Sequence, residues 1–536
     1  MVTTGVMTLT SALLFSAALP NELFPLGSAL LGAVALAPYY LALHRTAEAK
    51  HAARLGALFG GVSTILSNYW LMFFEDYSVW TIGGTTLAYI AFNYLLAGFL
   101  WRAIRSPRHT RALLFALVWT FYEYLKSIGF LGYPWGLAAY PFNELHAFNQ
   151  LAGITGVWGL SFLAVYLNAV LAEWLTLPRR RLPGPISTML SVPVVRDTAF
   201  LAILLAATAG YGLSRLATEV PVRDTIDLTL VQQNADAWNT RDIARPLLTS
   251  QRETLEAIEA FAETPELIVW SETSLRYFYV QGRDWYARNP IGEPFLEFLS
   301  GLPAPLLTGA PYRDPDDDFA VYNAALLIDQ STDVEQWYGK QHLVPFAEVI
   351  PFWHVPVVQR LFREVIGIPG AWAPGPGNRL FEIRGNDGSE IRIATPICFE
   401  DGFAYINRRF VQAGADLLIN LTNNSWSRTN SAQLQHFVAA RYRAIETRRG
   451  LVRSTNSGYT TIIDAHGRVS EAAPMFVTTH LNARVPVYAP VTESPYMIWG
   501  DIVPQIIAAA LLVLLLTDAL AAGRKKKGRP MTPLVE

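Results

Sequence analysis

The chain has 536 residues, of which 51% are hydrophobic and only 16% are charged, whereas an average soluble domain has about 25% charged residues. This composition indicates a membrane protein with a soluble part, and the net charge of −2 gives no indication of a nucleic-acid partner. The single cysteine excludes an intramolecular disulfide and any multi-cysteine metal site. The nine histidines show no metal-ligand spacing, so we expect no metal and no cofactor.

The first part, residues 1–218, contains seven apolar stretches long enough to cross a bilayer. We predict membrane spans at Val2–Leu19, Pro25–Leu43, Ala53–Phe74, Trp80–Trp101, Ala112–Ile128, Leu160–Leu177 and Ala199–Leu213. The fifth stretch carries two charges, Glu123 and Lys126, three residues apart on one helical face. Charges inside a membrane are candidates for function, and a mutually paired couple near the helix end is the alternative.

The loops between these spans alternate in charge. Basic residues follow the second, fourth and sixth spans, namely Arg45, Lys50, Arg54, Arg102, Arg105, Arg108, Arg111, Arg179, Arg180, Arg181 and Arg196. The loop after the third span is acidic, with Glu75 and Asp76, and residues 129–159 contain no Lys or Arg. An eighth apolar stretch, Met497–Leu520, is followed by five basic residues between Arg524 and Arg529. Because basic loops stay in the cytoplasm, we predict that both termini are cytoplasmic and that residues 219–496 are extracytoplasmic.

Residues 219–496 have the composition of a soluble domain. We predict strands at Ile226–Gln232, Leu267–Trp270, Leu306–Gly309, Ala324–Ile328, Ile391–Ile397, Leu417–Leu421, Leu451–Ser454 and Thr460–Ile463. We predict helices at Thr254–Glu263, Ala404–Gln412 and Gln433–Arg449, the last with an apolar stripe that we assign to the core. Strands alternating with helices favour an α/β domain with roughly parallel central strands, covered by helices on both faces.

Three segments of this domain place a chemically capable residue at or just past the end of an apolar strand. Glu272 follows Leu267–Trp270, Lys340 precedes an apolar loop, and Cys398, the only cysteine, follows the strand Ile391–Ile397. Taken singly, they are also typical of a surface carboxylate, a solvated lysine and an inert buried thiol. Together they supply a base, a cation and a nucleophile, with the amide of Phe399 as a second donor to an oxyanion.

Glu272, Lys340 and Cys398, in this order in an α/β domain, resemble the nitrilase superfamily. The surrounding motifs resemble one branch of it, the apolipoprotein N-acyltransferase family. They lie at Trp270–Thr273, Tyr338–Glu348, Ile397–Glu400, Asn423–Trp426, Gln435–Phe437, Arg453–Gly458, Gly132–Trp135 and Gly156–Phe162. The resemblance covers essentially the whole chain. It implies a multi-pass α-helical membrane domain of about eight spans with a nitrilase-like αββα sandwich on its extracytoplasmic side. The expected division is residues 1–218 with seven spans, 219–496 catalytic, 497–520 as the eighth span and 521–536 as a basic cytoplasmic tail.

The resemblance also implies a role for each matching residue. Cys398 is expected as the nucleophile, Glu272 as the general base and Lys340 as the cation that stabilises the oxyanion. Supporting or substrate-binding roles are implied for Glu348, Glu400, Phe399, Trp238 and Trp426. The sequence departs from the family pattern at Ala347, where glycine is expected, and at Phe399, where tyrosine is common and a hydroxyl is therefore lost.

The activity that the resemblance implies is a two-step acyl transfer. A phospholipid donates an acyl chain to Cys398 as a thioester, and the N-terminal amine of a diacylglyceryl-cysteine in an apolipoprotein accepts it. The implied enzyme is a monomer in a bacterial inner membrane, with its catalytic domain on the periplasmic side. Aromatic segments at Tyr277–Tyr279, Trp285-Tyr286 and Phe352–Phe362 are either interfacial arms around the acyl chains or ordinary packing.

Other functions fit parts of the same pattern. A membrane-tethered amidase of the nitrilase type would use the same three residues with water as the second nucleophile, but a soluble substrate does not require eight spans. A transporter with an accessory domain is less favoured, because the spans contain few charges beyond Glu123 and Lys126 and no internal repeat is evident. The intact set of Glu272, Lys340 and Cys398 argues against an inactive homologue.

Overall fold

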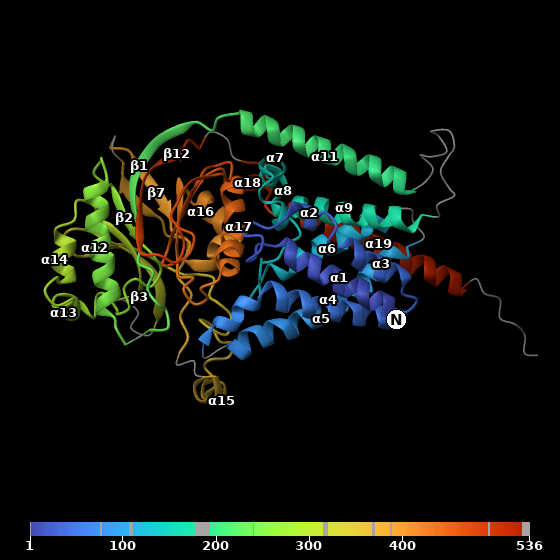
Figure 1. Ribbon diagram of the computed structural model, residues 1–536, viewed down its shortest axis with the longest axis horizontal. Coiled ribbons are helices and arrows are strands. Elements are labelled where there is room, and N and C mark those ends of the chain that lie inside the picture. Colours follow the sequence, from blue (N-terminus) through green and yellow to red (C-terminus); the bar gives the residue numbers. More distant parts are fainter. Residues whose placement is uncertain are drawn as a thin grey trace, which may run out of the picture.

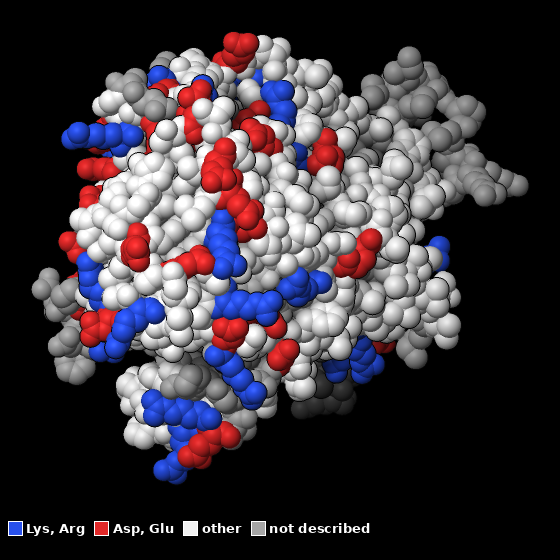
Figure 2. Space-filling view, turned by 60° about the vertical axis from the view of Figure 1, so that its left-hand side comes forward, with Lys and Arg blue, Asp and Glu red and all other residues white. Residues whose placement is uncertain are grey.

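The computed structural model describes residues 2–75, 78–106, 111–177, 193–239, 241–314, 320–366, 370–385, 388–490 and 494–527. Figure 1 shows two parts joined end to end, an α/β part at the left and a bundle of helices at the right. Charged side chains cover the α/β part, which faces the viewer in Figure 2, whereas the helical part behind it carries few. This division follows the change in composition near residue 219.

The bundle consists of long helices that run roughly along the long axis of the molecule (Figure 1). They are α1 (Val2–Ala18), α2 (Ala29–Gly32), α3 (Ala37–Arg45), α4 (Ala49–Ser67), α5 (Ser78–Ile104), α6 (Arg111–Lys126), α9 (Val157–Thr176), α11 (Pro193–Ala217) and α19 (Ile502–Lys527). Of the described helices, α5, α9 and α11 are long and apolar enough to cross a membrane, and α1 and residues 502–517 are shorter apolar helices. The three long helices coincide with the predicted fourth, sixth and seventh spans.

The second predicted span, Pro25–Leu43, is not one helix. Helix α2 ends at Gly32 and α3 begins at Ala37. Asn168 of α9 bonds to both sides of this break, because its Nδ2 donates to the oxygen of Gly32 at 2.8 Å and its Oδ1 accepts from the amide of Leu36 at 2.8 Å. A side chain from another helix thus satisfies backbone groups that a continuous helix would have paired internally.

Two other predicted spans end or begin elsewhere. The third predicted span continues to Phe74, but α4 stops at Ser67 and a 3₁₀ turn, η1 (Tyr69–Phe73), follows. The eighth was placed at Met497–Leu520, but Met497 lies in a separate short helix, α18 (Pro495–Trp499), and α19 starts after Gly500, whose φ of +58° breaks the helix. The helix then continues through Lys527, so part of the predicted basic tail is helical. Predictions for Asp76, Arg108, Arg179, Arg180, Arg181 and Arg529 lie outside the described residues.

The α/β part contains two six-stranded sheets, with orders β12-β1-β2-β3-β4-β5 and β11-β10-β9-β8-β7-β6. The first sheet consists of β1 (Val222–Gln232), β2 (Leu267–Trp270), β3 (Leu306–Arg313), β4 (Val321–Ile328), β5 (Val334–Gly339) and β12 (Thr479–Tyr488). The second consists of β6 (Phe381–Arg384), β7 (Glu390–Ala394), β8 (Leu417–Thr422), β9 (Gly450–Thr455), β10 (Thr461–Ile463) and β11 (Val469–Ala472). The pairs β1–β2, β2–β3, β7–β8 and β8–β9 are parallel and the outer pairs antiparallel, which confirms the predicted parallel centre.

The sheets face each other and helices cover their outer faces. Strand β9 contacts β1, β2 and β12 of the opposite sheet. Helices α12 (Ala244–Ala260), α13 (Arg283–Tyr286) and α14 (Phe295–Ser300) lie on the far side of the first sheet, and α16 (Ala404–Gln412) and α17 (Asn430–Thr447) lie between the second sheet and the bundle (Figure 1). This is the αββα arrangement that the resemblance implied.

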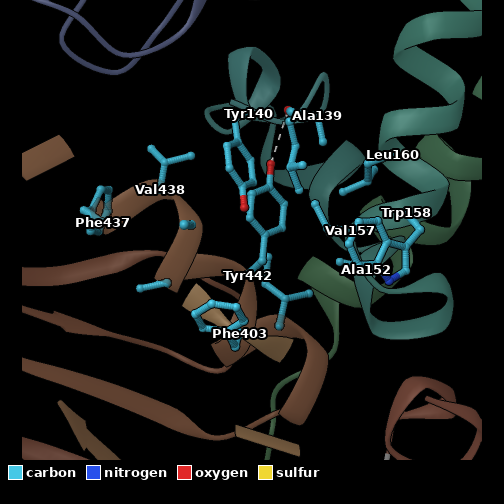
Figure 3. Close-up of a cluster of buried hydrophobic side chains, with 14 of the residues drawn as sticks. Ala139, Tyr140, Ala152, Val157, Trp158, Leu160, Phe403, Phe437, Val438 and Tyr442 are labelled. Atoms are coloured by element: carbon cyan, nitrogen blue, oxygen red, sulfur yellow. Dashed lines mark hydrogen bonds between the residues drawn. The ribbon is translucent and has the colours of Figure 1, made fainter. Parts of the chain in front are cut away.

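One continuous core joins the two parts. Figure 3 shows Phe437, Val438 and Tyr442 of α17 packed beside residues of the bundle, and the ring of Tyr442 stacks on Tyr140 at 5.7 Å. Residues Ser431–Thr447 of α17 are all buried, so the predicted apolar stripe is core, and the remaining faces of the helix are buried too. Helix α17 therefore fixes the α/β part on the bundle.

Candidate active site

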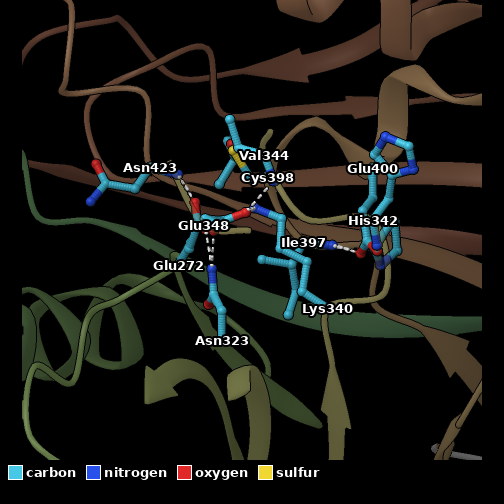
Figure 4. A network of polar contacts seen from close by, with 12 residues as sticks. Glu272, Asn323, Lys340, His342, Val344, Glu348, Ile397, Cys398, Glu400 and Asn423 are labelled. Carbon is cyan, nitrogen blue, oxygen red and sulfur yellow. Dashed lines mark hydrogen bonds and ion pairs between the residues drawn. The ribbon is translucent and has the colours of Figure 1, made fainter. Parts of the chain in front are cut away.

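Glu272, Lys340 and Cys398 meet in one buried cluster (Figure 4). Glu272 lies two residues past β2, Lys340 directly follows β5, and Cys398 opens a 3₁₀ turn, η5 (Cys398–Gly402), after β7. Glu272 is 5% exposed and Lys340 is 1% exposed, and Cys398 is half-buried. Strand ends from two facing sheets bring residues that are far apart in sequence to the same place.

The ammonium group of Lys340 is held by carboxylates. Its Nζ lies 2.9 Å from Glu348 Oε2 and 3.7 Å from Glu272 Oε1. Burial opposes the charge on Lys340, but the negative charges of Glu348 and Glu272 outweigh it and raise the pKa of the ammonium above its ordinary value. Lys340 is therefore a fixed cation next to the cysteine.

Glu272 is a carboxylate with an altered basicity. Its Oε1 accepts from Asn323 Nδ2 at 2.9 Å and its Oε2 accepts from the amide of Asn423 at 2.8 Å. Burial raises the pKa of Glu272, and Lys340 opposes this shift. A raised pKa brings a carboxylate closer to the range in which it accepts and returns protons near neutral pH.

The Cys398 thiol is neutral at rest. Burial raises its pKa above the ordinary value, with a further contribution from the negative charge of Glu272, while Lys340 acts in the opposite direction. Cys398 has a φ of +55°, a backbone conformation that is uncommon for a residue with a side chain. Its carbonyl accepts from Asn420 Nδ2 at 2.9 Å. The thiol therefore needs a base to form the thiolate, and the turn that carries it needs external support.

Glu400 provides part of this support. This fully buried carboxylate accepts from the amides of Gln341 at 2.8 Å, His342 at 2.9 Å and Ile397 at 2.8 Å. Burial raises the pKa of Glu400 and the amide donors oppose this shift, so that the pKa is about 7. Glu400 thus joins the loop after Lys340 to the strand end before Cys398.

The other predicted site residues occupy distinct places. Phe399 is half-buried and its ring lies 5.2 Å from Lys340 Nζ and 6.5 Å from the ring of Trp135 in the bundle. Trp238 and Trp426 pack against each other at 5.0 Å, and Trp238 contacts Phe74 of the bundle at 6.3 Å. These three aromatic residues therefore lie where the α/β part meets the helices.

Asn323 was not predicted and is central to the site. Its Nδ2 donates to Glu272 Oε1 at 2.9 Å and to Glu348 Oε1 at 3.0 Å, so one amide orients both carboxylates. It is the third residue of β4 and lies one position before Ala324, where we predicted this strand to begin. A polar side chain inside an otherwise apolar buried strand was the available signal, because a buried amide needs a partner.

Glu123 and Lys126 do not form an ion pair with each other in the part of the chain that the structure describes. Lys126 Nζ donates to the oxygen of Trp135 at 2.7 Å. Glu123 Oε1 accepts from Trp119 Nε1 at 2.9 Å and from the amide of Ala138 at 2.8 Å. Both charges hydrogen bond to the loop that carries Trp135 rather than to each other, and they fix that loop.

The predicted aromatic segments divide into buried and exposed ones. Tyr279 and Tyr286 are each 1% exposed and belong to the core beside the first sheet, which is ordinary packing. By contrast, α15 (Pro356–Leu361) and the residues before it project from the body of the molecule (Figure 1). Phe352 is 71% exposed and Leu361 is 49% exposed. Tyr277 is 41% exposed, but the segment around α15 is more exposed and retains the apolar character expected of an interfacial arm.

Two facing sheets with a buried carboxylate, lysine and cysteine at their strand ends define a protein of the carbon-nitrogen hydrolase class. Residues 228–487 match the family model described as carbon-nitrogen hydrolase, and residues 11–170 match the N-terminal domain of apolipoprotein N-acyltransferase. The chain is 36% identical to apolipoprotein N-acyltransferase 2 of Treponema denticola, over 97% of this chain and 98% of that protein. It is 40% identical to apolipoprotein N-acyltransferase 2 of Treponema pallidum, over 91% of this chain and 90% of that protein.

A third relative extends this similarity. The chain is 30% identical to apolipoprotein N-acyltransferase of Borreliella burgdorferi, over 94% of this chain and 93% of that protein. The similarity in all three cases includes both the helical part and the α/β part. The chain belongs to the apolipoprotein N-acyltransferase family.

Proposed function

We propose that this chain transfers an acyl chain from a membrane phospholipid, through a thioester on Cys398, to the N-terminal amine of diacylglyceryl-cysteine in apolipoproteins. One observation carries this proposal beyond the family relationship. The residue after the cysteine, Phe399, lies 6.5 Å from Trp135 of the bundle, so the nucleophile lies at the end of the α/β part that meets the membrane helices. That position suits substrates anchored in lipid.

In the first half-reaction, Glu272 removes the proton from Cys398 Sγ and the thiolate attacks the ester carbonyl of the phospholipid. A carbon–sulfur bond forms, the carbon–oxygen ester bond breaks, and Glu272 returns the proton to the departing alcohol, a lysophospholipid. Lys340 Nζ and the amide of Phe399 stabilise the oxyanion of the tetrahedral intermediate. Glu348 keeps Lys340 in place, at 2.9 Å.

In the second half-reaction, the neutral amine of the diacylglyceryl-cysteine attacks the thioester carbonyl. Glu272 takes a proton from the attacking nitrogen, the carbon–nitrogen bond forms, and the carbon–sulfur bond breaks. The proton on Glu272 then returns to the sulfur of Cys398. Water in place of the amine would give the amidase-type hydrolysis, so exclusion of water from the buried cluster favours transfer.

The supporting residues divide into two kinds in this proposal. Glu348 and Glu400 hold the lysine loop and the cysteine turn in register. Trp238 and Trp426 form part of an aromatic wall that continues to Phe74 of the bundle, where an apolar acyl chain or the diacylglyceryl group would bind. The wall assignment predicts that these two residues affect the KM for lipid more than kcat.

We further propose eight membrane crossings and a periplasmic α/β domain in the bacterial inner membrane. The start of α1 and the end of α19 both lie at the end of the bundle far from the α/β part (Figure 1). An even number of crossings produces this arrangement, and the broken pair α2 and α3 supplies the second of them. Residues 1–218 and α19 then form the membrane domain, residues 219–496 form the catalytic domain, and the enzyme acts as a monomer.

The exposed segment around α15 is proposed as an arm that lies in the lipid interface. Its apolar residues include Phe352 at 71% exposed and Val357 at 70% exposed. Phe346, in the loop that links Lys340 to this segment, contacts Phe130 of the bundle at 5.9 Å. Deletion of Phe352–Phe362 should lower activity on membrane-embedded phospholipid, and unchanged activity would refute the arm.

The test of the function uses purified protein in detergent and a phospholipid labelled in its acyl chain. We expect label on the wild-type protein that hydroxylamine removes, and no label on Cys398→Ala. Because Cys398 is the only cysteine, a hydroxylamine-labile label reports this site alone. Addition of a diacylglyceryl-cysteine peptide should move the label to the peptide. No label on either protein would refute the phospholipid donor and favour the amidase.

A further inference from the structure

The turn that carries Cys398 is fastened on two opposite sides. Glu400 holds one side, as described above. On the other side, the fully buried Asp401 accepts at Oδ2 from Arg453 Nε at 3.0 Å, and its Oδ1 lies 2.6 Å from His436 Nε2. Although burial opposes its charge, His436 and Arg453 hold the pKa of Asp401 below its ordinary value. Asp401 is therefore a charged anchor three positions beyond the strained Cys398 and one beyond Glu400.

The second ring nitrogen of His436 contacts a different loop. His436 Nδ1 lies 3.1 Å from Nδ2 and 3.2 Å from Oδ1 of Asn424. The preceding residue, Asn423, donates its amide to Glu272 Oε2 at 2.8 Å. His436 is 3% exposed and joins the turn of the nucleophile to the loop that holds the general base.

The protonation of His436 follows from its partners. Burial lowers the pKa of His436, so the ring is neutral near pH 7. A carboxylate can only accept, so Nε2 carries the hydrogen that faces Asp401. Nδ1 is then the acceptor for the amide of Asn424. Each ring nitrogen therefore serves one of the two loops.

His436 is also attached to the membrane part through the helix that carries it. The adjacent Gln435 donates its Nε2 to the backbone oxygens of Pro20 and Ser67, each at 2.9 Å, and accepts from Trp70 Nε1 at 3.3 Å. Those partners lie at the ends of α1 and α4 and in η1. The position of the membrane helices thus extends through α17 to the turn of Cys398.

We propose that His436 is a positioning residue that sets the distance between the Cys398 turn and the Glu272 loop. It acts on the backbone of the turn and not on the sulfur, through Asp401, Asn424 and a backbone hydrogen bond with Cys398. This role of His436 rests on the proposed function, because it affects acyl transfer only if Glu272 activates Cys398. An unpositioned turn would leave the thiol beyond reach of its base.

Two substitutions separate the two arms of the imidazole. His436→Gln places an amide near the former Nε2 and keeps a donor for Asp401, whereas His436→Asn places its amide near the former Nδ1 and loses Asp401. The two amides differ by one methylene group, so the melting temperature is measured for both and each variant is the control for the other. We expect His436→Asn to lower the rate constant for acylation of Cys398 at least about tenfold, as for loss of a hydrogen bond to a charged group. His436→Gln should retain the rate within about threefold.

The measurements are the acylation rate, the KM for phospholipid, the melting temperature, and alkylation of the single cysteine by iodoacetamide as a function of pH. The expected result is a lower acylation rate constant and slower alkylation at neutral pH in His436→Asn, with unchanged KM and a loss of rate larger than the difference in melting temperature from His436→Gln explains. Equal rates in the two variants, or losses that follow melting temperature alone, would overturn the proposal. Alkylation does not depend on lipid, so it distinguishes failure of this inference from failure of the phospholipid donor.

Discussion

A glutamate and a lysine lie near each other at two places in the described part of the chain, Glu123 with Lys126 in the bundle and Glu272 with Lys340 in the α/β domain, and their hydrogen-bond partners differ. Lys126 donates to a backbone oxygen at 2.7 Å, and Glu123 accepts from an indole and a backbone amide. Lys340 instead lies between two carboxylates, 2.9 Å from Glu348 and 3.7 Å from Glu272. The first pair is close in sequence and the second is far apart.

The difference shows that burial of a charge does not by itself identify a catalytic group. A charge whose hydrogen bonds go mainly to backbone groups fixes a loop. A charge surrounded by titratable groups that include a thiol changes the proton affinity of each of them. Glu272, Lys340 and Cys398 meet this second condition. Substitutions at both places test whether the partners of a charge, rather than its burial, decide its role.

The largest combined effect on stability and activity is expected for Lys340→Met. The substitution leaves Glu272 and Glu348 buried without their cation, which costs about 3–5 kcal/mol of stability. Loss of the oxyanion donor should lower the rate of Cys398 acylation by about 10²–10³-fold or more. Labelled phospholipid and melting temperature in detergent measure the two effects. Lys340→Arg, which keeps the charge with a different geometry, is the control, and a methionine variant with more than about a tenth of wild-type activity would exclude the oxyanion role.

Glu272→Gln should lower acylation by about 10²–10⁴-fold, because the amide cannot accept the thiol proton. The pH profile carries the sharper test. Wild-type activity should fall as pH decreases through the raised pKa of Glu272, since the protonated carboxyl is no longer a base. The residual activity of the variant should instead rise with pH as the thiolate forms, because burial keeps the pKa of Cys398 high. A variant that keeps the acid limb of the wild type would show that another group is the base.

The sequence predicted Glu272 and Cys398 because each follows an apolar strand, β2 or β7, that lies inside its sheet. Lys340 follows the edge strand β5, which was not predicted, so only the motif pattern identified it. The alternation of strands and helices predicted the parallel central strands. The four strands that were missed, β5, β6, β11 and β12, are the edges of the two sheets. Edge strands are partly exposed, as in the alternating burial of β6 and the exposed β11, so they lack the continuous apolar run of a central strand.

The interior of the membrane part was harder to predict for a different reason. The break between α2 and α3 depends on Asn168, which is more than a hundred residues away, and the partners of Glu123 lie in a loop that no periodicity describes. Spacing along one helix placed Glu123 and Lys126 on the same face. It did not reveal that both side chains hydrogen bond to the loop that carries Trp135. Polar residues in apolar segments marked both places without revealing their partners.

Asn323→Ala tests the site residue that sequence patterns did not reveal. The substitution removes hydrogen bonds of 2.9 Å to Glu272 and 3.0 Å to Glu348. Loss of donors to two carboxylates should lower the acylation rate by about 10- to 100-fold, equivalent to about 1.5–3 kcal/mol. Asn323→Asp is nearly isosteric and adds a third carboxylate, so its loss should exceed that of alanine. An aspartate variant as active as the wild type would show that Asn323 only fills space.

The smallest effect on chemistry is expected for Lys126→Met, the counterpart of Lys340→Met in the bundle. It leaves the carbonyl of Trp135 without the donor at 2.7 Å, which should cost about 1–3 kcal/mol of stability. Acylation should fall by less than about tenfold and in proportion to the folded fraction, because no titratable partner of the reaction is lost. The same labelling and melting measurements apply to both lysine variants. A loss of activity as large as that of Lys340→Met, at an unchanged melting temperature, would show that Lys126 takes part in the reaction. The partners of a charge would then not distinguish a charge that fixes a loop from a catalytic one.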